Sequence, residues 1–156
     1  IRYILEKSYH LATSGRPGPV LIDIPMDLQR KKVNPSSLKS YKPKKNEDNK
    51  INEKIKTIIK ELKKSAKPII ILGGGIKYAK AELILKKALK KLNIPVVTTW
   101  SGVDLIDHSE KQYIGNLGVY GSRAANFAVQ NSDLILSLGS RLDTRVTGGV
   151  PKNFCT

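Results

Sequence analysis

Apolar residues in the second part of the chain follow two alternating patterns, one typical of helices and one of buried strands. Ile51, Ile55, Ile58 and Leu62 lie on one face of a helix. The pattern predicts helices over residues 51–62, 81–92 and 122–130, and strands at 68–72, 95–100 and 133–139. Because these runs do not alternate strictly between apolar and polar residues, burial of both strand faces is expected. The order of elements predicts an α/β fold, a Rossmann-like parallel sheet with helices on both faces.

The first fifty residues follow a different pattern. Residues 1–14 have helical spacing and end at helix-breaking residues, and the apolar run 20–25 predicts a short buried strand. From residue 26 to 50 the chain is polar and charged and shows no periodicity. We therefore assign 1–29 to the C-terminal tail of one α/β domain, 30–50 to an inter-domain linker and 51–156 to a second domain, incomplete at its C-terminus.

Charge is distributed unevenly along this chain, whose formal net charge is +15. Residues 30–91 hold 20 lysines and arginines against 5 acidic residues, which accounts for the whole excess. Only Tyr41 and Tyr78 are aromatic there, so the stacking platforms of single-strand binders are missing. A solvated lysine-rich surface is the favoured interpretation, and a basic nucleic-acid-binding protein is a less favoured alternative. We expect no nucleic-acid partner.

Two further features of composition restrict the class of protein. No apolar stretch is long enough to span a bilayer, so no membrane partner is expected. The single Cys155 excludes an internal disulfide framework and favours a reducing, cytoplasmic location. Neither His10 nor His108 has metal-ligand spacing, and no nucleophilic triad is present, so we expect neither catalytic nor metal-binding residues. The candidate residues indicate binding.

The candidate binding residues follow the ends of the predicted strands, where parallel sheets bind ligands. Gly73–Gly75 follows the first strand and permits either a close backbone approach to a phosphate or simply a tight turn. The G-x-G-x-x-G dinucleotide pattern fails because residue 78 is tyrosine, and the P-loop pattern is also absent. The second strand ends at Trp100, which either packs on a flat ligand or lies in the core. A glycine-rich loop spans 115–121.

The third strand runs into Arg141, Asp143 and Arg145. Guanidinium groups suit phosphate oxygens, and the aspartate between them either orients an arginine or accepts from a ligand hydroxyl. The alternative is a surface ion-pair cluster.

Several ordered motifs resemble one known family. GRPGPVLIDIPMDLQ resembles the end of the pyrimidine-binding domain of thiamine-diphosphate-dependent enzymes. PIIILGGGI, IPVVTTWSG and IGNLGVYGSRAANFAVQNSDLILSLGSRLDTRVTGG resemble the central domain of the acetolactate-synthase-like branch. The resemblance implies that the chain is a fragment of a longer enzyme, which decarboxylates a 2-keto acid and transfers the resulting unit to a second carbonyl compound. That parent belongs to the transferases and lyases.

The resemblance also implies cofactors. Thiamine diphosphate and Mg²⁺ would bind outside this segment, and the central domain would hold a structural FAD, an ADP or nothing. The implied cofactor-binding residues are Gly73, Gly74, Gly75, Thr99, Trp100, Ser101, Leu117, Gly118, Val119, Tyr120, Gly121, Gly139, Ser140, Arg141, Asp143, Arg145 and Val146. The implied partners are the other domains of the same chain, a 2-keto acid substrate and further copies in a homodimer or homotetramer. The alternative within this fold is a non-catalytic nucleotide-binding or assembly module.

Five residues in three segments depart from the family pattern. The synthases usually carry methionine and histidine where this chain has Val119 and Tyr120, and a second aspartate at Thr144. Trp100 and Ser101 replace a leucine and a methionine. These departures lie within the candidate site.

Overall fold

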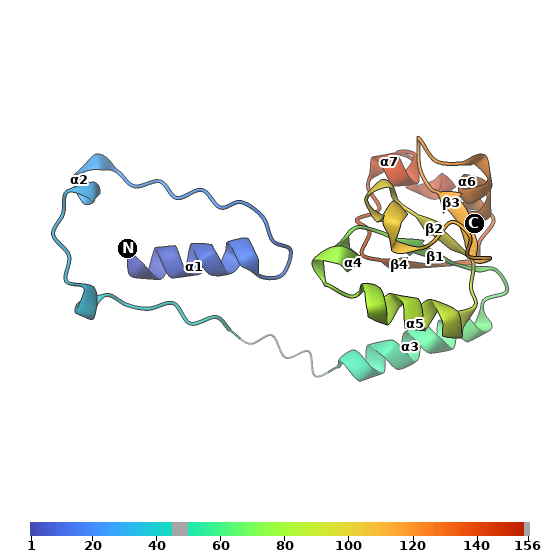
Figure 1. Ribbon diagram of the computed structural model, residues 1–156, viewed down its shortest axis with the longest axis horizontal. Coiled ribbons are helices and arrows are strands. Elements are labelled where there is room, and N and C mark those ends of the chain that lie inside the picture. Colours follow the sequence, from blue (N-terminus) through green and yellow to red (C-terminus); the bar gives the residue numbers. More distant parts are fainter. Residues whose placement is uncertain (45–49, 155–156) are drawn as a thin grey trace. The chain divides into compact units, whose positions relative to one another are not determined.

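The computed structural model describes residues 1–44 and 50–154, in two compact units, Ile1–Asn49 and Lys50–Thr156 (Figure 1). Each unit is described by itself. The division falls at the end of the predicted linker, whose residues 45–49 lie outside the described residues, as does Cys155. No helix in the described ranges is long and apolar enough to cross a membrane.

The second unit is built on a four-stranded parallel sheet. Its strands are β1 (Pro68–Leu72), β2 (Val96–Thr98), β3 (Tyr113–Asn116) and β4 (Leu134–Leu138), in the order β3-β2-β1-β4. Ile70 is in register with Val96 on one side and Leu136 on the other. The predicted parallel α/β sheet is therefore confirmed.

Helices cover both faces of this sheet. The longer ones are α3 (Ile51–Lys64), α5 (Glu82–Leu92) and α6 (Arg123–Gln130); α4 (Gly75–Tyr78), α7 (Thr144–Thr147) and two 3-10 helices (Trp100–Leu105 and Pro151–Asn153) are short. Successive residues of a strand point to opposite faces. Ile70 accordingly packs with Leu89 of α5, whereas Ile71 packs with Val129 of α6. Burial on both faces explains why the strands are continuously apolar.

Two local signals in the sequence define helix ends. The Ser122 hydroxyl accepts a hydrogen bond from the Ala125 amide at 3.1 Å and caps the start of α6. Asn93 adopts the left-handed conformation, with φ of 49°, and ends α5. β3, in contrast, was not predicted. It is short and contains Gly115, and its pairing with β2 includes a register shift.

The first unit contains α1 (Arg2–Thr13), α2 (Met26–Gln29) and a 3-10 helix at Pro35–Ser37. The predicted helix at 1–14 is confirmed. The predicted strand at 20–25 is wrong, because the structure assigns no strand there and the Leu21 side chain is 94% exposed. A strand is stabilised by pairing with a neighbour and by covering of its apolar face. The described part of the first unit contains neither a strand that pairs with residues 20–25 nor an element that buries their apolar side chains.

Candidate functional site

The loops after the four strands carry all the predicted site residues. Since the strands are parallel, their carboxyl ends lie at one edge of the sheet. The strand order brings the loop after β1 between those after β4 and β2, with the loop after β3 next to β2. We call this edge, formed by residues 73–75, 99–101, 117–121 and 139–146, the strand-end site.

The loops after β1 and β4 interlock through their backbones. The Gly73 amide donates to the Leu138 carbonyl at 2.8 Å, and the Gly75 amide donates to the Gly139 carbonyl at 2.9 Å. A Cβ atom on Gly73 would clash with the Gly139 oxygen and lie 2.6 Å from the Cα of Ser140. Gly139 itself has a φ of +66°, in the left-handed region that glycine tolerates. These glycines are therefore required by the packing of one loop against the other.

The loop after β2 is attached to the first glycine turn. The Ser101 hydroxyl accepts a hydrogen bond from the Gly74 amide at 3.2 Å, and a Cβ on Gly74 would lie 2.9 Å from the Ser101 side chain. The Thr99 amide donates to the Leu72 carbonyl at 2.8 Å, and Thr99 is buried. Of the residues predicted here, Ser101 and Trp100 are exposed at the edge.

The glycine-rich loop after β3 is held from two directions. The Val119 amide donates to the Arg145 carbonyl at 2.9 Å, which joins this loop to the arginine segment. The Asn126 side chain bonds both backbone groups of Gly118: it accepts from the amide at 2.9 Å and donates to the carbonyl at 3.0 Å. Asn126 was not predicted. An asparagine one turn into the helix after a glycine loop is the signal that could have indicated it.

Asp143 organises the arginine segment. Its Oδ1 accepts from the amides of Arg145 at 3.1 Å and Val146 at 3.3 Å, so it caps α7. Its Oδ2 accepts from the Arg141 guanidinium at 3.0 Å. This hydrogen bond from Arg141 lowers the pKa of Asp143 below its ordinary value, despite an opposing desolvation effect, and the amide of Val146 lowers it further. Asp143 therefore remains an ionised hydrogen-bond acceptor at neutral pH.

The two arginines differ in their surroundings. The Arg141 side chain is 70% exposed and is held by Asp143. Arg145 is also exposed, and it makes no ion pair with any residue in the described part of the chain. Two predicted site residues contribute to packing: Leu117 is buried in the core cluster that includes Val129 of α6, and Val146 is half-buried against that cluster. The arginine segment thus presents two exposed cationic groups, the guanidinium groups of Arg141 and Arg145.

Two aromatic rings lie exposed at the same edge. Trp100 and Tyr120 are 66% and 75% exposed, and their ring centroids are 5.2 Å apart. Trp100 is therefore not a core residue. Exposed adjacent rings provide a surface on which a planar ligand can stack. Together with Arg141 and Arg145, they give the strand-end site the chemical groups that suit an aromatic anion.

Most of the glycine-turn amides at this edge are already engaged. The amides of Gly73, Gly74, Gly75, Gly118 and Val119 all donate within the chain. Further polar contacts to a ligand would therefore come mainly from side chains. Among the described residues, no group of three or more histidines, cysteines or carboxylates could hold a metal ion. Of the two histidines, His108 stacks on Tyr113 at a centroid distance of 4.9 Å.

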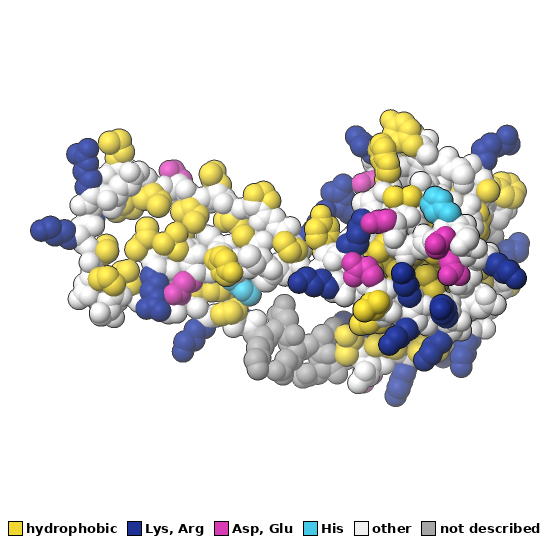
Figure 2. Space-filling model, in the orientation of Figure 1, with side chains coloured by type: hydrophobic (Ala, Val, Ile, Leu, Met, Phe, Trp, Pro, Cys, Tyr) yellow, Lys and Arg dark blue, Asp and Glu magenta, His cyan; other side chains and the backbone are white. Residues whose placement is uncertain are grey.

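Figure 2 shows the basic side chains on one face of the molecule. On the second unit they are spread around the periphery, interrupted by acidic and apolar groups, and do not form one continuous stripe. Many of these lysines lie on the exposed positions of α3 and α5. This arrangement is typical of a solvated helix surface.

The fold and the strand-end site together define a class: a Rossmann-like α/β domain whose strand-end loops present arginines and aromatic rings. Residues 55–156 match the family described as thiamine pyrophosphate enzyme, central domain. The chain therefore belongs to the thiamine pyrophosphate-dependent enzymes, in their acetolactate-synthase-like branch.

Similar proteins support this assignment. The chain is 40% identical over 153 residues to the acetolactate synthase large subunit of Lactococcus lactis, a match that covers 96% of this chain and 26% of that protein. It is 36% identical over 162 residues to the large subunit of Haemophilus influenzae, covering 97% of this chain and 27% of the relative. A match to the isozyme 2 large subunit of Escherichia coli is 36% identical, covering 93% and 26%. The chain thus spans about a quarter of the length of these relatives.

Proposed function

We propose that this chain is the central-domain part of a thiamine-diphosphate-dependent enzyme that decarboxylates a 2-keto acid and ligates the product to a second carbonyl compound. Residues 1–29 would be the tail of its pyrimidine-binding domain, and 30–50 the linker. The similarity to acetolactate synthases along nearly the whole chain supports this function. Thiamine diphosphate and Mg²⁺, which supply the decarboxylation chemistry, would be held by other parts of the enzyme. The relatives' designation as large subunits supports assembly with further subunits, and we expect a homodimer or homotetramer.

The strand-end site would hold FAD or ADP as a structural group. Two features of the strand-end site carry this proposal. The exposed Arg145 guanidinium makes no ion pair with any described residue, and the rings of Trp100 and Tyr120 lie exposed and adjacent to each other on neighbouring strand-end loops. Arginine suits a pyrophosphate and an aromatic surface suits a planar ring. Arg145 and Arg141 would bind the phosphates, and Trp100 and Tyr120 would cover the ring. The group would act by holding the loops in place.

Trp100 provides the test, because it is the single tryptophan of the chain and lies at the site. The purified chain would be titrated with FAD and, separately, with ADP while tryptophan emission is recorded. We expect saturable quenching by one of the two, and about tenfold weaker binding in Arg145→Gln, since a lost charge-assisted hydrogen bond contributes about 1.5 kcal/mol or more. The control is Arg16→Gln, which removes the same charge from the first unit.

Two outcomes would contradict the cofactor proposal: no saturable binding of either compound, or equal weakening by both substitutions. The first would leave an assembly module without a nucleotide. The catalytic proposal is tested separately, in a full-length protein that contains this sequence. Release of CO₂ from pyruvate should depend on added thiamine diphosphate and Mg²⁺, and its absence under those conditions would refute the activity.

A further inference from the structure

The first unit contains a basic cavity that the proposed function does not use. It has a volume of about 700 Å³ and lies between α1 and the segment 39–44. This volume is within the range of about 300–1,000 Å³ found for small-molecule sites. Its lining consists of two tyrosines, one histidine, one serine and four lysines: Tyr3, Lys7, His10, Lys39, Ser40, Tyr41, Lys42 and Lys44. We call it the α1 cavity.

The wall formed by residues 39–44 is fixed to α1 by Glu6. Its carboxylate accepts hydrogen bonds from the Tyr41 amide at 2.6 Å and the Ser40 hydroxyl at 2.9 Å, and from the Arg2 guanidinium at 2.7 Å. The Arg2 hydrogen bond, followed by those of Tyr41 and Ser40, lowers the pKa of Glu6 to about 2. The negative charge of Glu6 is thus engaged with Arg2 and the backbone of the wall.

The aromatic residues form the floor of the cavity. Tyr41 packs edge-on against Tyr3, with ring centroids 5.4 Å apart, and in a tilted arrangement against His10, with centroids 5.6 Å apart. Neither tyrosine hydroxyl has a hydrogen-bond partner within the described ranges, so both are free to donate to a ligand. The sequence did not indicate this cluster, because Tyr3 and His10 lie outside the lysine-rich region in which aromatic residues are sparse.

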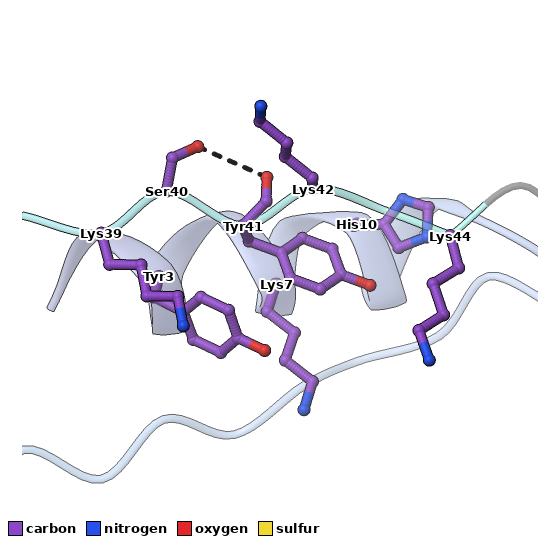
Figure 3. Close-up of a pocket in the computed structure, with 8 residues that line it drawn as sticks. All are labelled: Tyr3, Lys7, His10, Lys39, Ser40, Tyr41, Lys42 and Lys44. Carbon is purple, nitrogen blue, oxygen red and sulfur yellow. Dashed lines mark hydrogen bonds between the residues drawn. The ribbon is translucent and has the colours of Figure 1, made fainter.

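Three lysines extend to the same side as the tyrosine rings in Figure 3: Lys7, Lys39 and Lys44. Lys39 lies over the Tyr3 ring at 6.0 Å, and none of the three pairs with a carboxylate among the residues described. Lys42 points the opposite way in the same view. These ammonium groups, which have no carboxylate partner, lie with two phenol hydroxyls on the lining of one cavity. They present hydrogen-bond donors and no negative charge, which is the chemistry that binds phosphate oxygens.

We propose that the α1 cavity binds a small molecule carrying several phosphate groups, with the phosphates on Lys7, Lys39 and Lys44 and on the tyrosine hydroxyls. A single phosphate would leave part of this positive charge uncompensated. The site is independent of the strand-end site, since all of its residues belong to the first unit.

The test is calorimetric titration of the whole chain with ATP and with tripolyphosphate, which separate a contribution of the nucleoside from that of the phosphate chain. The test variant is Lys7→Gln/Lys44→Gln, and the matched control is Lys31→Gln/Lys32→Gln, which removes the same charge from residues of the same unit that do not line the cavity. A unit-charge contact at about 4 Å in water contributes about fivefold in affinity, so the loss of two such contacts should weaken binding by about twenty-five-fold in the test variant. The control should lose less than about threefold.

Each outcome decides the proposal. Saturable binding of one equivalent of either compound, lost selectively in the Lys7/Lys44 variant, supports it. Equal loss in both variants would show diffuse charge attraction and would overturn it, as would no saturable heat up to millimolar concentrations. ATP binding that is abolished by Arg145→Gln and unaffected by Lys7→Gln/Lys44→Gln would place the nucleotide at the strand-end site and also overturn the proposal.

Discussion

Replacement of Gly73 by alanine tests whether the strand-end loops interlock as the structure shows. The added Cβ would lie 2.6 Å from the Cα of Ser140 and closer still to the Gly139 oxygen. Carbon atoms in contact prefer separations of about 3.5–4.0 Å, so one loop must move by about 1 Å. The atoms that obstruct the methyl group are backbone atoms, and no side-chain rotation relieves the clash.

The expected cost follows from what that displacement disrupts. Overpacking contributes about 1–3 kcal/mol. The displaced loops also carry the hydrogen bonds from Gly73 to Leu138 and from Gly75 to Gly139, each with a net contribution of about 1 kcal/mol. We therefore expect Gly73→Ala to lower the free energy of unfolding of the second unit by about 3 kcal/mol or more. With about 4 °C per kcal/mol, the melting temperature should fall by at least about 12 °C.

The assay is equilibrium unfolding in urea, followed by Trp100 emission, with the free energy obtained by linear extrapolation. The matched control is Gly148→Ala, because Gly148 has a φ of +76° but no atom within 4 Å of its Cβ position. That substitution strains the backbone without a clash and should cost about 1 kcal/mol. A Gly73→Ala protein within 0.5 kcal/mol of the unsubstituted chain, or more stable than the control, would refute the interlocked arrangement.

Three further substitutions test the contacts of the second unit. Asp133 accepts hydrogen bonds from the amide of Lys67 and from the Ser65 hydroxyl, and the Ser65 bond is the main cause that lowers the pKa of Asp133 below its ordinary 3.8. The ionised carboxylate therefore stabilises the fold fully above pH 3.8, and this stabilisation is lost as the pH falls below that value. In a denaturation series at about pH 2–7, Asp133→Asn should lose less unfolding free energy on acidification than the unsubstituted chain. Asn126→Ala should lower the free energy of unfolding by about 1–3 kcal/mol, because both backbone groups of Gly118 lose their hydrogen-bond partner. An unchanged midpoint of urea unfolding would contradict a stabilising role for these two hydrogen bonds. Ser137→Ala should raise the melting temperature, since the Ser137 hydroxyl is buried without a partner in the described structure; a lower melting temperature would show that the hydroxyl is satisfied.

Much of the second unit could be predicted because its central strands, β1 and β2, are buried on both sides. Ile70 and Ile71 point to opposite layers of helices, so a continuous apolar run identifies a central strand. β3 lacks that signal: its residues are half-buried and include Gly115, and pairing with β2 is what makes it a strand. Residues 20–25 show the reverse, an apolar run without a strand to pair with.

The position of the candidate site could also be predicted, because parallel strands end at the same edge. Its internal contacts could not. Asn126 and Asp143 act through hydrogen bonds between their side chains and backbone groups a few residues away. The periodicity of apolar residues does not predict such hydrogen bonds. The same holds for the α1 cavity, where Tyr3 and Tyr41 are adjacent in space and far apart in the chain.

The strand-end site separates the atoms that hold the loops from the atoms that can meet a ligand. The loops are joined mainly by backbone groups, as in the hydrogen bond from Val119 to the Arg145 carbonyl, which any residue except proline could make at position 119. Three of the side chains that depart from the family pattern, Val119, Tyr120 and Trp100, are instead 66–75% exposed. Substitution at these positions can therefore alter what binds while leaving the loops in place. If the strand-end site holds a nucleotide, these exposed residues are where a choice between FAD and ADP would be made.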